Sequence, residues 1–237
     1  MDLRGQRRGK GGHEESAEAG EFWRCTLIEA ETRLRAARGI AKNETRAAIE
    51  AFRLLKERRG HAHSPPPLVS DGWGGYDEAL IEVWGEVPEY RGRGRPPTKK
   101  RPQPGWQYLQ VVEQREKGRV IGVEAKVVYG DEREVLGLLG RSTSYVERTN
   151  LTSRHMNGRL VRKTLGYSKE LGMLRASSIW EDVIYNLGRA LKSLRMESLE
   201  AGRRWIGRSP AMAAGLTDHI WDIEELLTVL PLPTTNS

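Results

Sequence analysis

The spacing of apolar and polar residues along the chain predicts an alternation of strands and helices. Residues 22–40 alternate apolar and polar positions on either side of the run IEAET, which is typical of a β-hairpin. Residues 43–59 repeat apolar side chains at helical spacing, and Asn43 is suited to cap the first turn. The pair Leu68–Val69 follows three prolines and predicts a short strand that ends at Asp71.

The second half of the chain continues this alternation. Two β-branched runs around a charged turn predict another hairpin over residues 108–130, with a short helix directly after it. Helices are expected over 145–165 and 170–195. The second has an apolar stripe that should face the core, formed by Leu174, Trp180, Val183, Ile184, Leu187, Leu191 and Leu194. Near the carboxyl end, Asp222 and Glu225 have capping-box spacing at the start of a short helix.

These elements predict an α/β fold with one substantial domain and two tails. Residues 1–21 mix glycine with charges and have no hydrophobic period, so we expect a mobile tail there. The domain covers residues 22–200, and residues 201–237 form a carboxyl-terminal tail with a short helix. Within the domain, we interpret residues 91–131 as an insertion that holds a basic loop and the second hairpin.

Composition favours a polyanionic partner. The formal net charge is +7, and seven Trp with seven Tyr supply surfaces that can stack on bases, although a basic ribosomal protein would share this balance. No apolar run approaches the roughly twenty residues of a membrane span, and the polar amino end has no signal core, so we expect a cytoplasmic protein. The single cysteine, Cys25, excludes an internal disulfide and a zinc ribbon.

Glu147 begins a stretch that is otherwise cationic, since no second acid occurs before Glu170. On an ideal helix Glu147 shares a face with Arg154, seven residues later. A neighbouring arc would hold five cationic or titratable side chains: Arg148, His155, Arg159, Arg162 and Lys163. This arrangement suits a metal ligand beside a surface that follows a phosphate backbone. An ordinary ion pair of Glu147 with Arg148 or Arg154 is the alternative.

Asp71 lies in the glycine-rich turn DGWGG, where a carboxylate after a strand can approach a bound ion without hindrance. Its alternative role is to close an Asx turn through its own side chain. Phosphodiester cleavage by two metal ions needs hard oxygen ligands that converge from separate elements. Asp71 and Glu147 are therefore candidates for such a pair.

The segments LVSDGWGGY at 68–76 and YVERTNLTSRHMNGRLVRKTLGYSK at 145–169 together resemble bacterial insertion-sequence DDE transposases, in the group founded on insertion sequence one. That family carries its middle aspartate in a T/S-D-G-W-x-x-Y turn and its glutamate in I/V-E-R-x-N-L-x-x-R. Asp71, Glu147 and Arg154 match these positions. The resemblance extends over most of residues 22–225, including the tail motif SPAMAAGLTDHIW.

The resemblance implies an RNase H-like fold, a mixed sheet flanked by helices, that cleaves DNA and transfers the strand. Asp71 and Glu147 would be catalytic and would hold two Mg²⁺ or Mn²⁺ ions, and Arg154 would touch DNA near the scissile phosphate. Further DNA contacts would come from Arg148, Arg159, Arg162 and Lys163. DNA at the element ends and the target, a homo-oligomeric complex and a location at the nucleoid are implied as well.

The family also needs a first aspartate on a central strand. Asp2 is the only aspartate before Asp71, and the residues after it lack the apolar alternation of such a strand. We therefore expect a copy truncated at its amino end, with weak metal binding and little strand transfer by itself. The competing hypotheses are an active transposase, an inactive fragment that only binds DNA or full-length transposase, and a basic structural protein of a ribonucleoprotein.

The basic loop after residue 90 contains the cations Arg91, Arg93, Arg95, Lys99, Lys100 and Arg101 and no acid. Of these, we expect Arg93, Arg95, Lys99 and Lys100 to bind DNA. The core Arg93-Gly94-Arg95-Pro96 is similar to that of AT-hooks, which lay arginines into a narrow minor groove. A flexible basic loop without a fixed ligand is the alternative. His61 and His63 are expected to lie in a solvated loop rather than on a metal.

Overall fold

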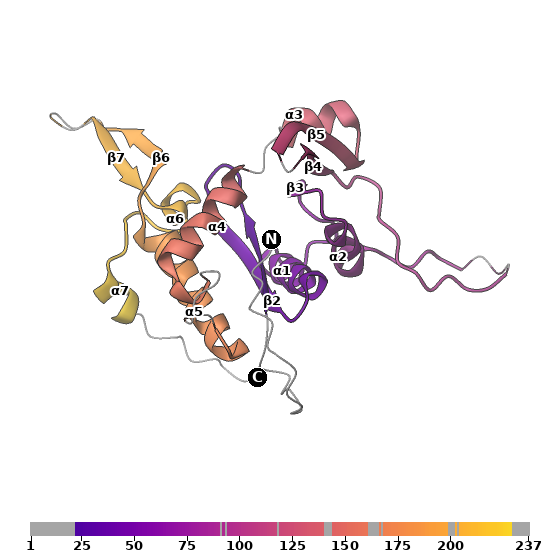
Figure 1. The fold of residues 1–237 in the computed structure, drawn as a ribbon, viewed down its shortest axis with the longest axis horizontal. Helices are drawn as coiled ribbons and strands as arrows, with labels where there is room; N and C mark the ends of the chain where they lie inside the picture. The colour runs from indigo at the N-terminus through magenta and orange to yellow at the C-terminus, as the bar shows by residue number, and fades with distance from the viewer. Residues whose placement is uncertain are drawn as a thin grey trace. The chain divides into compact units, whose positions relative to one another are not determined.

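The computed structural model describes residues 22–90, 92, 94–117, 119–139, 144–160, 166, 168–198, 202 and 204–228 (Figure 1). The architecture is mixed α/β, as predicted. The chain forms two compact units, one of residues 22–27 and 36–175 and the other of residues 28–35 and 176–228. The division falls inside the segment that the sequence assigned to one domain. The predicted tail over residues 1–21 lies outside the described residues.

The first unit begins with the predicted hairpin, β1 (Trp23–Ile28) and β2 (Arg35–Ala41), followed by α1 (Glu44–Arg58). The Asn43 side chain accepts a hydrogen bond from the Arg46 amide at 2.8 Å, which confirms the predicted cap. The backbone of β2 approaches α1 closely, because a Cβ on Gly39 would lie 2.0 Å from the Ala47 carbonyl oxygen. Small residues on both elements therefore permit this packing.

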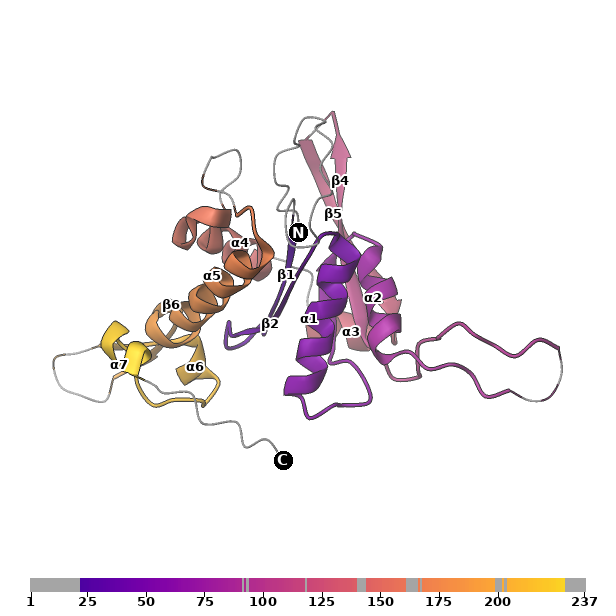
Figure 2. The same cartoon turned by 90° about the horizontal axis from the view of Figure 1, so that it is seen from below.

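A mixed sheet follows, made of β3 (Leu68–Asp71), β4 (Tyr108–Glu116) and β5 (Arg119–Tyr129). The central strand β4 pairs parallel with β3 and antiparallel with β5. The second predicted hairpin, β4–β5, thus belongs to the same sheet as β3, the strand that ends at Asp71. Helix α2 (Gly75–Trp84) packs beside α1 in both ribbon views (Figures 1 and 2), with the Phe52 and Trp84 rings 5.7 Å apart.

The next helices are α3 (Glu132–Leu139), as predicted, and α4 (Ser144–Met156), which a 3₁₀ turn η1 (Gly158–Leu160) follows. Helix α4 ends at Met156, so the prediction of one helix over 145–165 was wrong. Asn157 and Gly158 end it, and the Asn157 side chain accepts from the Arg159 amide at 3.1 Å. Arg159 therefore lies in η1 and not on the predicted arc of α4.

The prediction of a helix over 170–195 was wrong at its carboxyl end. Helix α5 (Leu171–Val183) continues into a π-helical turn η2 (Ile184–Gly188), and the chain then forms β6 (Leu191–Glu197). Leu194 is buried on that strand, whereas Trp180 of the predicted core stripe is 39% exposed. Strand β7 (Trp205–Arg208), which pairs antiparallel with β6, was not predicted.

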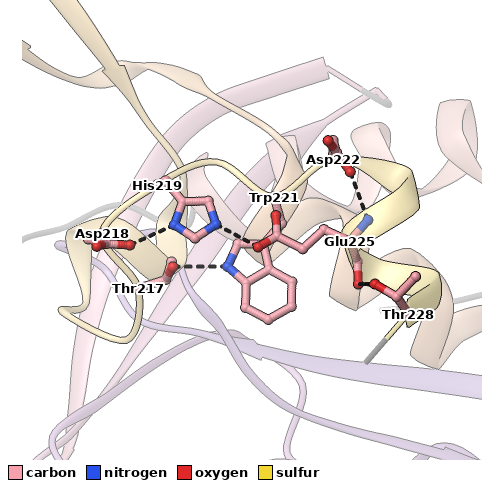
Figure 3. Close-up of polar contacts among 7 residues, drawn as sticks. All are labelled: Thr217, Asp218, His219, Trp221, Asp222, Glu225 and Thr228. Atoms are coloured by element: carbon pink, nitrogen blue, oxygen red, sulfur yellow. Dashed lines mark hydrogen bonds and ion pairs between the residues drawn. The ribbon is translucent and has the colours of Figure 1, made fainter. Parts of the chain in front are cut away.

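The second unit ends in two short helices, α6 (Pro210–Ala213) and α7 (Ile223–Thr228). Asp222 caps α7 by accepting from the Glu225 amide at 2.8 Å, in line with the predicted capping spacing. The Glu225 carboxylate turns instead to His219, whose Nε2 lies 2.8 Å away, while His219 Nδ1 lies 2.6 Å from Asp218 (Figure 3). The imidazole also stacks on Trp221, and its contact with Glu225 joins the loop to α7.

The hydrogen bonds from His219 to Asp218 and then to Glu225 raise the pKa of His219 above its ordinary value of 6.5. A protonated His219 that binds both carboxylates stabilises the folded state. This contribution is complete below pH 6.5 and is lost as the pH rises through the raised pKa, because a neutral imidazole can donate to only one carboxylate. We expect Glu225→Gln to lower the pKa of His219, measured by NMR titration of its ring protons. The control Glu224→Gln removes an exposed carboxylate from the same helix and should leave that pKa in place. Equal pKa values for His219 in the chain and in Glu225→Gln would contradict the bridge.

Candidate functional site

Asp71 is the last residue of β3, opposite Val111 of β4, and is exposed. Its Oδ1 accepts a hydrogen bond from the Trp73 amide at 3.1 Å. The Asx turn considered as the alternative role is therefore present. Because a carboxylate has two oxygens and several lone pairs, closing the turn and binding an ion are compatible roles for one side chain.

Side chains of β4 hold the turn at Asp71 in place. The hydroxyl groups of Ser70 and Tyr108 are hydrogen-bonded at 2.8 Å. The Gln110 amide donates to the Tyr108 hydroxyl at 3.0 Å and to the Trp73 carbonyl at 3.3 Å. Burial raises the pKa of Tyr108, so its hydroxyl keeps its proton at neutral pH. The network fixes the direction in which β3 ends.

In the DGWGG turn, Gly75 is needed for the packing of Trp73. A Cβ on Gly75 would lie 2.2 Å from the Trp73 ring, so any larger residue would displace the indole. That indole meets Tyr76 edge to face, with ring centroids 4.8 Å apart. Gly74 has no atom within 4 Å of its Cβ position. A side chain would therefore fit at Gly74, whereas the Trp73 ring fills the space at Gly75.

The charge of Asp71 acts on residues of β1 and α2. Burial raises the pKa of Cys25 to about 11, with smaller contributions in the same direction from the negative charges of Asp71 and Glu44. Burial likewise raises the pKa of Tyr76, with a contribution from Asp71. Among the described residues β1 pairs with β2, and β3 pairs with β4.

Glu147 is exposed in the first turn of α4, where a carboxylate interacts favourably with the helix dipole. The buried face of α4 is formed by Thr149 and Ser153, which lie one turn apart. Glu147 and Arg154 belong to the same regular helix, so the prediction that they share a face is confirmed. Arg148 and His155 are exposed on α4.

The other predicted DNA contacts have different surroundings. Arg95 and Lys99 are exposed in the loop between α2 and β4, whereas Lys100 forms an ion pair with Glu82 at 3.1 Å. His61 and His63 are exposed in a connection without helix or strand, as expected. Several predicted site residues lie outside the described residues, namely Asp2, Arg93, Arg162 and Lys163.

In the part of the chain that the structure describes, no group of three or more His, Cys, Asp or Glu side chains is placed to hold an ion. The carboxylates of Asp71 and Glu147 are hard oxygen donors of the kind that Mg²⁺ and Mn²⁺ prefer. Two such residues fit the chemistry of these ions but do not complete a site. The same described residues contain no helix long and apolar enough to cross a membrane.

Sequence reasoning missed a buried ionic cluster in the second unit. The Arg35 guanidinium lies 2.5 Å from the Glu181 carboxylate and 3.1 Å from that of Asp182, with all three side chains almost fully buried. The guanidinium also stacks on Tyr185 at 3.9 Å. Two adjacent acids at the end of an apolar helix were a signal in the sequence that could have indicated a buried cation.

The structure places Asp71 and Glu147 where the sequence motifs predicted, at a strand end and a helix start. No protein-family model, curated protein or solved structure matches this chain.

Proposed function

We propose that this chain is the catalytic region of a DDE transposase and takes part in DNA strand cleavage and transfer. The observation that carries the proposal is the position of its two motif carboxylates. Asp71 is exposed at the end of a strand, and Glu147 is exposed at the start of a helix with Arg154 on the same face. A helix that carries an acid followed by cations suits a site that binds both an ion and a phosphate.

The proposal includes an RNase H-like fold. The mixed sheet, the hairpin β1–β2 and the helices α1 and α2 support it. In such a fold a further strand would carry the first aspartate of the motif, a role for which Asp2 is the available aspartate before Asp71.

Each group in the proposed site has its own part in the reaction. Asp71 and Glu147 would hold Mg²⁺ or Mn²⁺, which activates the attacking oxygen and stabilises the leaving one. Arg154 positions the phosphate, and Arg148 contacts the DNA backbone. A homo-oligomer at the element ends, acting at the nucleoid, completes the proposed assembly.

A second candidate function is a DNA-binding fragment that does not cleave. The residues after Asp2 lack the apolar alternation of a central strand, which favours it. In that case the cationic side chains still bind DNA, because phosphate contacts need no metal. The two candidates therefore differ in cleavage and agree in binding.

The test measures cleavage and binding with the same DNA, a duplex that carries the end of the flanking element. Strand cleavage that requires Mg²⁺ or Mn²⁺ would support the transposase. Binding with no cleavage in either metal would support the fragment. Failure to bind DNA at about 50 mM salt, where phosphate contacts are strong, would contradict both candidates.

A further inference from the structure

The strands β6 and β7 of the second unit lie side by side and are fixed at their base (Figure 1). Leu194 of β6 is buried. Directly after β7, Ser209 and Pro210 are buried as well, and the Ser209 hydroxyl accepts a hydrogen bond from the Met212 amide at 3.2 Å. The exposed side chains of the two strands are therefore presented from a fixed support.

The pairing of β6 with β7 contains a bulge that presents cations to solvent. The register of the two strands changes within residues 191–196. The Nε of Arg208 donates to the Leu194 carbonyl at 2.8 Å, so a side chain of β7 holds the bulge in place. Lys192 and Arg195 lie in the bulge and are exposed. Arg208 thus has a structural role, whereas Lys192 and Arg195 are accessible to a ligand.

Trp205 of β7 gathers two guanidinium groups on this surface. The guanidinium carbon of Arg195 lies 4.2 Å from the centre of the Trp205 ring, and that of Arg204 lies 5.4 Å from it. Both distances are within the range of cation–π attraction, about 6 Å. Arg204 is exposed, like Arg195, and Trp205 is half-buried. The indole therefore holds two positive charges close together at the surface.

The charges around Trp205 favour an anionic ligand. Two guanidinium groups at one ring repel each other, and an anion bound between them would offset this repulsion. Residues 189–208 contain six Arg or Lys and two Glu, so the sequence supplies too few acids to neutralise the cations. Among the described residues of this stretch, Glu197 is the one acid. A partner that supplies negative charge is therefore expected at this surface.

We propose that β6 and β7 bind the phosphate backbone of DNA through Lys192, Arg195 and Arg204. This inference rests on the proposed function, which supplies DNA as the partner, and it adds a contact in the second unit to those proposed on α4. Arginine suits the role because its planar group presents paired N–H donors to phosphate oxygens. Trp205 is a positioning residue, since it restricts the guanidinium groups before they bind. Backbone contacts of this kind carry no base preference.

The experiment measures the affinity of the full chain for a short DNA duplex by fluorescence anisotropy, over about 50–200 mM salt. The arginine variant is Arg195→Gln with Arg204→Gln. The control variant, Arg119→Gln with Lys126→Gln, removes the same charge from exposed positions on β5. Two further variants, Trp205→Leu and Trp205→Phe, keep every charge and test the positioning by the ring. Sedimentation velocity without DNA measures the self-association of each protein.

Each phosphate contact contributes about 0.9 to the slope of log affinity against log salt concentration, so the arginine variant should reduce the steepness of this slope by about 2. The control variant should keep the slope of the unaltered chain. Trp205→Leu should weaken binding about two- to fivefold, the effect of losing one exposed cation–π contact. Trp205→Phe retains an aromatic ring and should recover most of that loss. All these changes should be equal on A·T-rich and G·C-rich duplexes.

An unchanged slope in the arginine variant, or an equal reduction in the control variant, would overturn the inference and leave the proposed function standing. An arginine variant that binds DNA normally but no longer self-associates would also overturn it, because the surface would then belong to a contact with a second copy of the chain. If the unaltered chain did not bind DNA in the same titration, the proposed function and this inference would fail together. Binding through β6 and β7 requires no metal, so the result does not depend on cleavage.

Discussion

Glu147→Gln is expected to reduce metal-dependent DNA cleavage by about 10³-fold. The substitution keeps the size of the side chain and removes the charge that would hold a divalent ion. An ion of this kind contributes several kcal/mol to stabilising the transition state, and about 4 kcal/mol corresponds to a factor of 10³ in rate. Because Glu147 is exposed, the loss should not come from unfolding. The measurement is the single-turnover rate of cleavage in Mn²⁺.

Two controls separate catalysis from binding in this experiment. DNA affinity of Glu147→Gln should be unchanged or slightly higher, because removing a carboxylate from a cationic helix does not weaken phosphate contacts. Glu132→Gln alters another exposed acid in the first turn of a helix, α3, and should retain full cleavage. Comparable losses in both variants would show that general charge, and not Glu147, determines the rate.

Arg35→Met is expected to lower the free energy of unfolding by about 3–5 kcal/mol, the usual cost of removing one partner from a buried ion pair. The reason is that the carboxylates of Glu181 and Asp182 would remain buried without their cation. The backbone of Arg35 adds two hydrogen bonds with the Asn186 side chain, at 3.0 and 3.1 Å, which the variant keeps. The loss therefore reports on the guanidinium alone.

Urea unfolding followed by circular dichroism measures this effect. The control Arg53→Met breaks an exposed pair with Glu82 at 3.7 Å and should cost less than about 1 kcal/mol. Adding Glu181→Gln and Asp182→Asn to Arg35→Met removes the uncompensated charges and should restore part of the stability. If Arg35→Met unfolded at the same urea concentration as Arg53→Met, the buried cluster would not be a source of stability.

Local signals in the sequence predicted most elements, and tertiary pairing decided the rest. Asn43 before an apolar helical period determined the start of α1. The end of α4 was predicted too late, although Asn157–Gly158 is a local helix-ending signal. The strand β6 was not readable in this way, because Leu191 and Leu194 have a spacing that a helix also allows. Pairing with β7 across a loop imposes the strand there.

In the candidate site, too, local sequence predicted some features and long-range contacts determined the others. That Asp71 ends a strand and Glu147 begins a helix follows from neighbouring residues in the sequence. The support of the Asp71 turn by Tyr108 and Gln110 did not follow, because these residues come from β4, on the far side of the basic loop. Local patterns contain no information on such a long-range contact, nor on which acids converge in space.

We propose that Asp71 and Glu147 act together in one metal site. The most direct test is the cleavage rate of Asp71→Asn, Glu147→Gln and the double variant in Mn²⁺, beside the unaltered chain. Residues that act as a unit have strongly non-additive effects. We therefore expect each single variant to lose about 10³-fold and the double variant to lose no more than either. Losses that multiply in the double variant, or a single variant with full activity, would contradict a shared site.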